Sequence, residues 1–164
     1  MKALTLHRPW DYAIAHGHKC VENRTWATAY RGPLLIHAGM KWDQAAADEV
    51  FLVSGVWLNE RSWPGGRIVA LVYVDGCRRR HNMPKIESTM PRGWIEGPWC
   101  WLLGRTHLLD PIPCSGSQRL WTPPQDVLHE VRRQLGNWMV DGLLAGPNVD
   151  PNWQDPEEMC DAED

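Results

Sequence analysis

The chain alternates between segments with strand periodicity and segments with helix periodicity, which predicts a mixed α+β domain. Residues 3–7 predict a first strand, with Thr5 and His7 on the face opposite to its two leucines. Proline suits a first helical turn and glycine suits a helix end. A short helix is therefore expected between Pro9 and Gly17.

The strand expected next, over residues 20–26, places four side chains on one face: Cys20, Glu22, Arg24 and Trp26. A carboxylate, a guanidinium and an indole on one face, with the Lys19 ammonium just before them, form an unusual set for a hydrophobic core. This set suits a pocket for a polar, planar group. The ordinary alternative is that Glu22 and Arg24 form a partly exposed ion pair, which contributes little stability.

The middle of the chain continues the alternation. An apolar strand is predicted over residues 34–38, and a helix over residues 42–53 with Asp43 as its cap. Residues 67–74 are apolar on both faces, which is typical of a strand covered on both sides. We expect a turn at Asp75–Gly76 to end that strand.

The last third of the domain begins with a polar segment rich in proline and glycine, residues 82–98, which we interpret as a long loop. Strands are expected over residues 99–109 and 118–121, with a bend at residues 110–113 between them. Residues 126–135 predict an amphipathic helix.

The chain length of 164 residues predicts one domain, over residues 1–135, followed by an acidic tail over residues 136–164 that is partly docked or disordered.

The net charge of −3 divides unevenly, because residues 1–133 hold all 17 Lys and Arg against 12 Asp and Glu. A basic body suits phosphate contacts, and the alternative is a solvated surface without a ligand. The tail could bind a basic protein partner or cover the basic body.

Several classes of protein are not expected. No apolar run is long enough for a membrane span, and the first residues lack the apolar core of a secretion signal, so a cytoplasmic protein is predicted. The five cysteines form no C-x-x-C motif, which indicates reduced thiols. Cys77 and His81 lack a second ligand pair at the usual spacing, so we expect no metal and no cofactor.

Aromatic and basic residues give further candidates. Of the eleven tryptophans, most are expected in the core, and Trp94 in the long loop is a candidate lid or stacking residue. The run Arg78, Arg79 and Arg80 is equally compatible with phosphate binding and with a solvated loop. His37 is interpreted as a hydrogen-bonded interior histidine.

The motif PW, followed by G-x-K-x-x-E-x-R-x-W over residues 17–26 and LLIHA over residues 34–38, resembles the ASCH domain (activating signal cointegrator homology) of the PUA-like superfamily. Two later blocks extend the resemblance over roughly residues 1–125: GPWCW at 97–101 and GSQRLW at 116–121. Arg119 stands where the family usually has glycine. The resemblance implies a small PUA-like mixed β-barrel flanked by helices, with a nucleic-acid-binding cleft beside the G-x-K-x-x-E segment.

The first hypothesis is therefore a module that binds RNA or single-stranded nucleic acid, or a modified nucleoside, through a basic cleft lined with aromatic residues. The candidate binding residues are Arg8, Trp10, Lys19, Glu22, Arg24, Trp26, Arg78, Arg79, Arg80, Trp94, Gln118 and Arg119.

The alternative hypothesis is a small hydrolase. Some bacterial proteins that resemble this family are acetylcytidine amidohydrolases with a lysine, a threonine and a glutamate in the site, and ribonuclease activity is also proposed within the family. Lys19 matches the lysine, whereas Glu22 stands where those enzymes have threonine. Lys19 and Glu22 are thus the candidate catalytic residues.

Overall fold

A computed structural model describes residues 1–83 and 90–136, without the side chain of Arg92. Six strands form one sheet in the order β2-β5-β4-β3-β1-β6. The strands are β1 (Lys2–Arg8), β2 (Val21–Arg24), β3 (Gly32–Trp42), β4 (Arg67–Arg79), β5 (Trp99–Pro113) and β6 (Leu120–Trp121). The helices are α1 (Trp10–Ala15), α2 (Gln44–Ser54) and α3 (Gln125–Leu135), with short 3-10 turns at Arg80–Asn82 and Arg92–Trp94.

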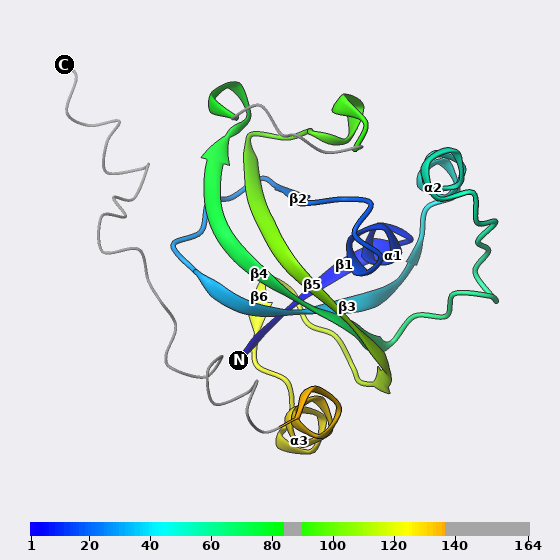
Figure 1. Cartoon of the computed structure of the whole chain (residues 1–164), viewed down its shortest axis with the longest axis vertical. Coiled ribbons are helices and arrows are strands. Elements are labelled where there is room, and N and C mark those ends of the chain that lie inside the picture. Colours follow the sequence, from blue (N-terminus) through cyan, green and yellow to red (C-terminus); the bar gives the residue numbers. More distant parts are fainter. Residues whose placement is uncertain (84–89, 137–164) are drawn as a thin grey trace.

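The sheet is mixed, because β1 and β3 run parallel whereas all other described pairs run antiparallel. The long strands β4 and β5 lie side by side in a strong curve, with α1 and α2 to one side and α3 below (Figure 1). The predicted α+β class is confirmed. Closure into a barrel stays a prediction, since the described backbone pairs leave β2 and β6 as the two edges of the sheet.

The core explains why the predicted elements form. The fully buried side chains of Ile36, Val72 and Trp101 share one apolar cluster on one side of the sheet. On the other side, α3 packs Val127 and Val131 against a second cluster, as its amphipathic pattern predicts. Within the part of the chain that the structure describes, the longest helices, α2 and α3, have 11 residues each, which is too short to cross the hydrocarbon core of a bilayer.

The helix predicted over residues 42–53 forms as α2, and its predicted cap is confirmed. The carboxylate Oδ1 of Asp43 accepts a hydrogen bond of 3.1 Å from the amide of Ala46. Gly55 ends the helix in the left-handed conformation, with φ of 71°.

Two predicted breaks are wrong. β4 continues through Asp75–Gly76 to Arg79, because a register shift against β5 accommodates Asp75 as the extra residue of a bulge, and Gly76 pairs with Leu102. A Cβ on Gly76 would lie 3.2 Å from the Leu102 side chain, so the glycine is closely packed within the strand pair. The predicted bend at residues 110–113 is likewise part of β5, with Ile112 opposite Ile68, since the fixed φ of proline is compatible with an extended strand end.

Two strands are shorter than predicted. β2 covers only Val21–Arg24 of the predicted 20–26. β6 covers only Leu120–Trp121, because Arg119 has a φ of 56° and leaves the strand conformation. The acidic tail predicted over residues 136–164 lies outside the described residues, except for Gly136.

Two ionisable residues are buried close together in sequence, Arg8 at the end of β1 and Asp11 in α1. The guanidinium of Arg8, only 1% exposed, donates to the carbonyls of Gly39 at 2.8 Å, Met40 at 2.5 Å and Trp63 at 2.8 Å. The side chain of Asp11 is 0% exposed and accepts a 2.6 Å hydrogen bond at Oδ2 from the indole of Trp63. Burial raises the pKa of Asp11 to about 6, against the opposing effect of that hydrogen bond.

We predict that Asp11→Asn removes a pH dependence of stability. The raised pKa means that the contribution of Asp11 to stability is fully present below pH 3.8 and is lost as the pH rises through about 6, by about 3 kcal/mol. Asparagine keeps an acceptor for Trp63 but cannot ionise. Urea unfolding should therefore show that the free energy of unfolding of the wild type falls between pH 4 and pH 7, relative to that of the variant. An equal pH dependence in the two proteins would contradict the raised pKa of Asp11.

Candidate nucleic-acid interface

One cavity of about 400 Å³ gathers five of the predicted binding residues: Trp10, Lys19, Glu22, Arg24 and Trp94. They come from α1, the segment that follows it, β2 and the turn before β5. Residues from β1 and α2 complete the wall. The local spacing of the G-x-K-x-x-E-x-R motif therefore does place its charged side chains around one hollow, which we call the first cavity.

Lys19 lies at the inner end of the first cavity. The left-handed turn at Gly17, with φ of 75°, is followed by a hydrogen bond of 3.0 Å from the Lys19 amide to Ala13. The side chain is only 3% exposed, and its Nζ donates to the carbonyl of Val21 and lies 5.7 Å from the centroid of the Trp10 ring. Burial lowers the pKa of Lys19, and the charge of Glu22 opposes this shift.

Glu22 and Arg24 form the ion pair considered above as the ordinary alternative. Arg24 Nε lies 3.0 Å from Glu22 Oε1, without a hydrogen-bonding angle. The Nη2 of Arg24 donates to the carbonyl of Thr5 at 3.0 Å. Arg24 thus connects β2, at one edge of the sheet, with β1 near the other edge, although their described backbones do not pair. The pair is therefore part of the cavity wall as well as a structural contact.

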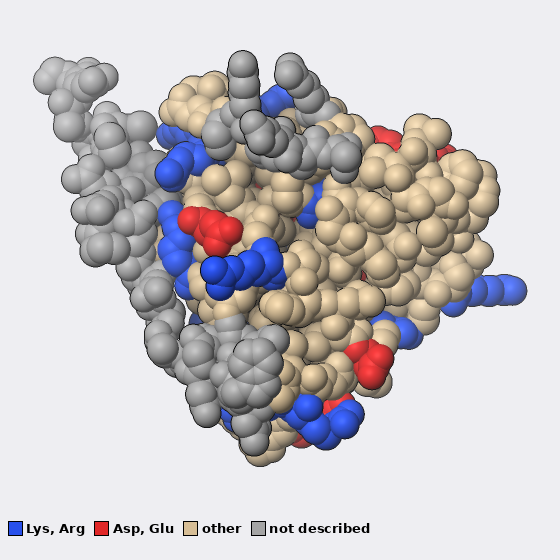
Figure 2. Space-filling model, in the orientation of Figure 1, with Lys and Arg blue, Asp and Glu red and all other residues tan. Residues whose placement is uncertain are grey.

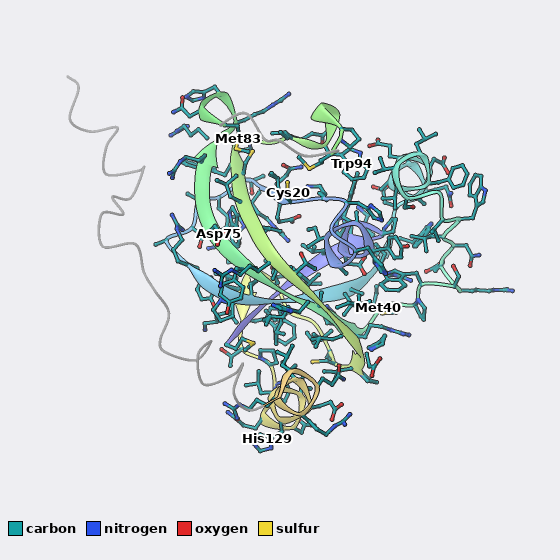
Figure 3. All side chains as sticks on the ribbon, in the orientation of Figure 1. Cys20, Met40, Asp75, Met83, Trp94 and His129 are labelled. Carbon is teal, nitrogen blue, oxygen red and sulfur yellow. The ribbon has the colours of Figure 1, made fainter. Side chains whose placement is uncertain are left out.

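Trp94 is a wall of the first cavity and not an exposed lid. It is buried, in the turn before β5 (Figure 3). Its ring meets the ring of Trp10 edge to face, with the centroids 5.2 Å apart. Asn23, which the sequence analysis did not select, positions this wall. Its side chain donates to the Trp94 carbonyl at 2.8 Å and accepts from the Glu96 amide at 3.1 Å. The only sequence signal for this role is the place of Asn23 between the two charged residues.

The first cavity is richer in acidic than in basic side chains, which differs from the expected basic cleft. Four carboxylates line it: Glu22, Asp43, Glu49 and Glu96. Lys19 and Arg24 are its only Lys or Arg among the described lining residues. On the face in Figure 2, the Lys and Arg side chains also lie in separate small groups and not in one continuous field. Glu22 belongs to the motif itself, whereas Asp43 caps α2, Glu49 lies within α2 and Glu96 lies in the segment before β5. The tertiary structure brings these three to the motif.

A second hollow, of about 510 Å³, adjoins the first cavity. The two share Thr5, His7 and Arg24 in their walls. The second hollow adds residues from β3 and from the segment before β6, and Gln118 and Arg119 from the predicted set line it. Thr5 and His7 lie on the polar face of β1 predicted from the sequence, and neither is among the predicted binding residues.

The remaining predicted residues lie elsewhere. Arg8 is buried, and backbone carbonyls surround its guanidinium, so it is not available to a phosphate. Trp26 packs edge to face on Trp101 at 4.7 Å, outside both hollows. Exposed side chains at the end of β4 belong to Arg78, Arg79 and Arg80, and the guanidinium of Arg79 lies 4.7 Å from the Trp99 ring centroid.

His37 is an interior histidine, as interpreted from the sequence. It is 2% exposed, its Nε2 lies 2.9 Å from the carbonyl oxygen of Cys114, and burial lowers its pKa. Because a carbonyl only accepts, Nε2 must carry the proton. Within residues 1–83 and 90–136, no group of acidic, histidine or cysteine side chains is arranged to hold a metal.

Comparison with known families agrees with the motif. The ASCH domain matches residues 4–105, which is more than half of the chain, so the protein belongs to the ASCH family of the PUA-like superfamily. No curated protein matches the chain.

We predict that Lys19→Met changes the pH dependence of stability in the alkaline range. A lowered pKa means that the unfolded chain binds the proton that folded Lys19 releases, so this residue makes wild-type stability rise with pH up to 10.5. The stability of Lys19→Met relative to the wild type should therefore fall as the pH rises from 7 to 10. Urea unfolding measures this difference, and Lys2→Met, outside the cavity, is the matched control. A constant difference would refute the prediction.

Proposed function

We propose that this ASCH protein binds RNA by taking one unpaired base into the first cavity. The observation that supports this most is that a buried amine, a carboxylate–guanidinium pair and two indoles line one hollow of about 400 Å³. That volume lies in the range of small-molecule sites, roughly 300–1,000 Å³. PUA-like folds such as the ASCH domain are commonly associated with RNA binding.

The polarity of the first cavity favours a base over a phosphate. Its four carboxylates would repel an anion but accept hydrogen bonds from the amino groups of adenine, cytosine or guanine. Lys19 can donate to a ring nitrogen or to a carbonyl oxygen of the same base. The half-buried ring of Trp10 offers an apolar surface beside it.

The depth of the cavity favours a single strand. Lys19 is almost completely buried, so a base must leave its stack to reach it. Sequence-specific RNA recognition commonly uses such unpaired bases, because their edges are then accessible to side chains. A base in a continuous duplex would have to be flipped at a cost of a few kcal/mol.

Hydrolysis of a modified nucleoside is the second candidate, and the lowered pKa of Lys19 favours it. A neutral amine can accept a proton from a water that attacks an acyl carbon. The acyl group would leave as a carboxylic acid, and the released amine of the nucleoside would take up the proton. Glu22 in the same cavity would hold the substrate or the water.

The binding proposal predicts that Glu22→Gln and Lys19→Met weaken binding of a short single-stranded RNA at least tenfold, because both alter the polar lining of the base site. Fluorescence anisotropy with labelled single-stranded RNA, single-stranded DNA and duplex RNA, each at two salt concentrations, measures this. Lys2→Met and Glu130→Gln are the controls, because each removes a charge of the same sign as its counterpart, Lys19→Met or Glu22→Gln, at a position outside the first cavity. Equal losses in the controls, or no binding by the wild type, would refute the proposal.

The hydrolase proposal predicts turnover of an acetylated nucleoside, or cleavage of labelled RNA, that both Lys19→Met and Glu22→Gln abolish. Turnover should rise with pH as Lys19 loses its proton. Chromatography of acetylcytidine and gel analysis of the RNA test the two reactions separately. Activity that survives in both variants would exclude these residues from the chemistry.

A further inference from the structure

We propose that the second hollow holds the phosphate and the neighbouring nucleotide of the strand whose base occupies the first cavity. This inference rests on the proposed RNA binding. It adds a site for a second nucleotide and a path for the strand from the first cavity to the second hollow. The smallest ligand that fills both sites is a dinucleotide.

The two hollows differ sharply in charge. Four carboxylates line the first cavity, whereas none is present among the described residues that line the second hollow. The charged or titratable groups of the second hollow are Arg24, Arg119, His7 and His37. A nucleotide has a base that is neutral and a phosphate that is negative. The lining therefore favours the base in the first cavity and the phosphate in the second hollow.

Arg24 lies at the boundary between the two hollows. Its Nη2 donates a hydrogen bond to the carbonyl of Thr5, and its Nε lies beside the carboxylate of Glu22, so the guanidinium is held in place. Its Nη1 has no hydrogen-bond partner among the described residues and can donate to a phosphate oxygen. Partial burial lowers the pKa of the adjacent His7, and the positive charges of Lys41 and Arg24 lower it further, against the opposing charges of Asp43 and Glu22. The Nη1 of Arg24, on the wall that the two hollows share, therefore offers a donor for the bridging phosphate.

The second hollow also offers surfaces for a nucleoside. Met40 is 73% exposed there, although it is a large apolar side chain (Figure 3). A base can pack on such a thioether. Gln118 is exposed and can pair with the edge of a base, and the exposed Arg119 can reach a second phosphate or stack on the base.

The segment that carries Gln118 and Arg119 is fixed in place before any ligand binds. Thr5 Oγ1 donates to the carbonyl of Ser117 at 2.8 Å and accepts from the indole of Trp121 at 3.2 Å. A side chain on Gly116 would come within 2.4 Å of the His37 ring, so the glycine lets this segment lie directly on β3.

The backbone at Arg119 is a separate indication. Its φ of 56° is unusual for a residue other than glycine, asparagine or aspartate and costs free energy. Such strain is often found at ligand sites, because the surrounding structure holds the residue where the ligand needs it. Arg105 has a similar φ of 44° but lies outside both hollows, with its guanidinium 5.5 Å from the Tyr73 ring centroid. It is therefore a matched control for Arg119.

The experiment compares ligands of increasing length for each of the four bases: the nucleoside, its 3′- and 5′-monophosphates, the dinucleotide and a decanucleotide. Tryptophan fluorescence of the full chain measures their affinities at two salt concentrations. We expect the best dinucleotide to bind at least tenfold more tightly than its nucleoside. Arg119→Gln should abolish most of this gain and reduce its salt dependence, while nucleoside binding stays within twofold of the wild type. Arg105→Gln should change neither.

The outcomes separate this inference from the proposed function. If the decanucleotides do not bind the wild type, the proposed RNA binding itself fails. If they bind but the dinucleotides are no better than nucleosides, the second site is refuted. An Arg119→Gln variant that weakens nucleosides and dinucleotides equally would also refute it, because Arg119 would then act on the first cavity.

Discussion

The arrangement of the site depends on the contacts that the guanidinium of Arg24 makes with Thr5 and Glu22. Its hydrogen bond to the Thr5 carbonyl joins a sheet edge to β1, two strands that are far apart in the sheet order. The same group pairs with Glu22 and separates the first cavity from the second hollow. A planar group with donors on several sides can make all these contacts at once, whereas an ammonium cannot fix their directions.

Burial of charge is the second feature that shapes this protein. Arg8, Asp11 and Lys19 are almost fully inaccessible to water, and each is compensated differently. Backbone carbonyls surround Arg8, the Trp63 indole donates to Asp11, and a carbonyl and the Trp10 ring meet Lys19. Arg8 therefore has a structural role, because its guanidinium already donates hydrogen bonds to backbone carbonyls. Lys19 is different, since it lines a hollow large enough for a ligand.

The sequence predicted most of the elements because their signals are local. Asp43 and Gly55 delimit α2, and the spacing of Val127 and Val131 defines the buried face of α3. The predicted breaks at Asp75–Gly76 and at residues 110–113 were wrong for a common reason. Residues that favour turns were accommodated in long, paired strands, where a bulge or a strand end tolerates them.

The sequence by itself determined most of the elements and the composition of the motif around Lys19, Glu22 and Arg24. A glycine turn followed by a short strand fixes the relative positions of these three residues. Only the tertiary structure decided which charges meet them. Carboxylates from α2, its cap and the segment before β5 make the first cavity acidic, and the segment before β6 gives the second hollow Arg119 in addition to Arg24. Those segments are distant along the chain, and their approach depends on the curvature and pairing of the whole sheet, which no local pattern encodes.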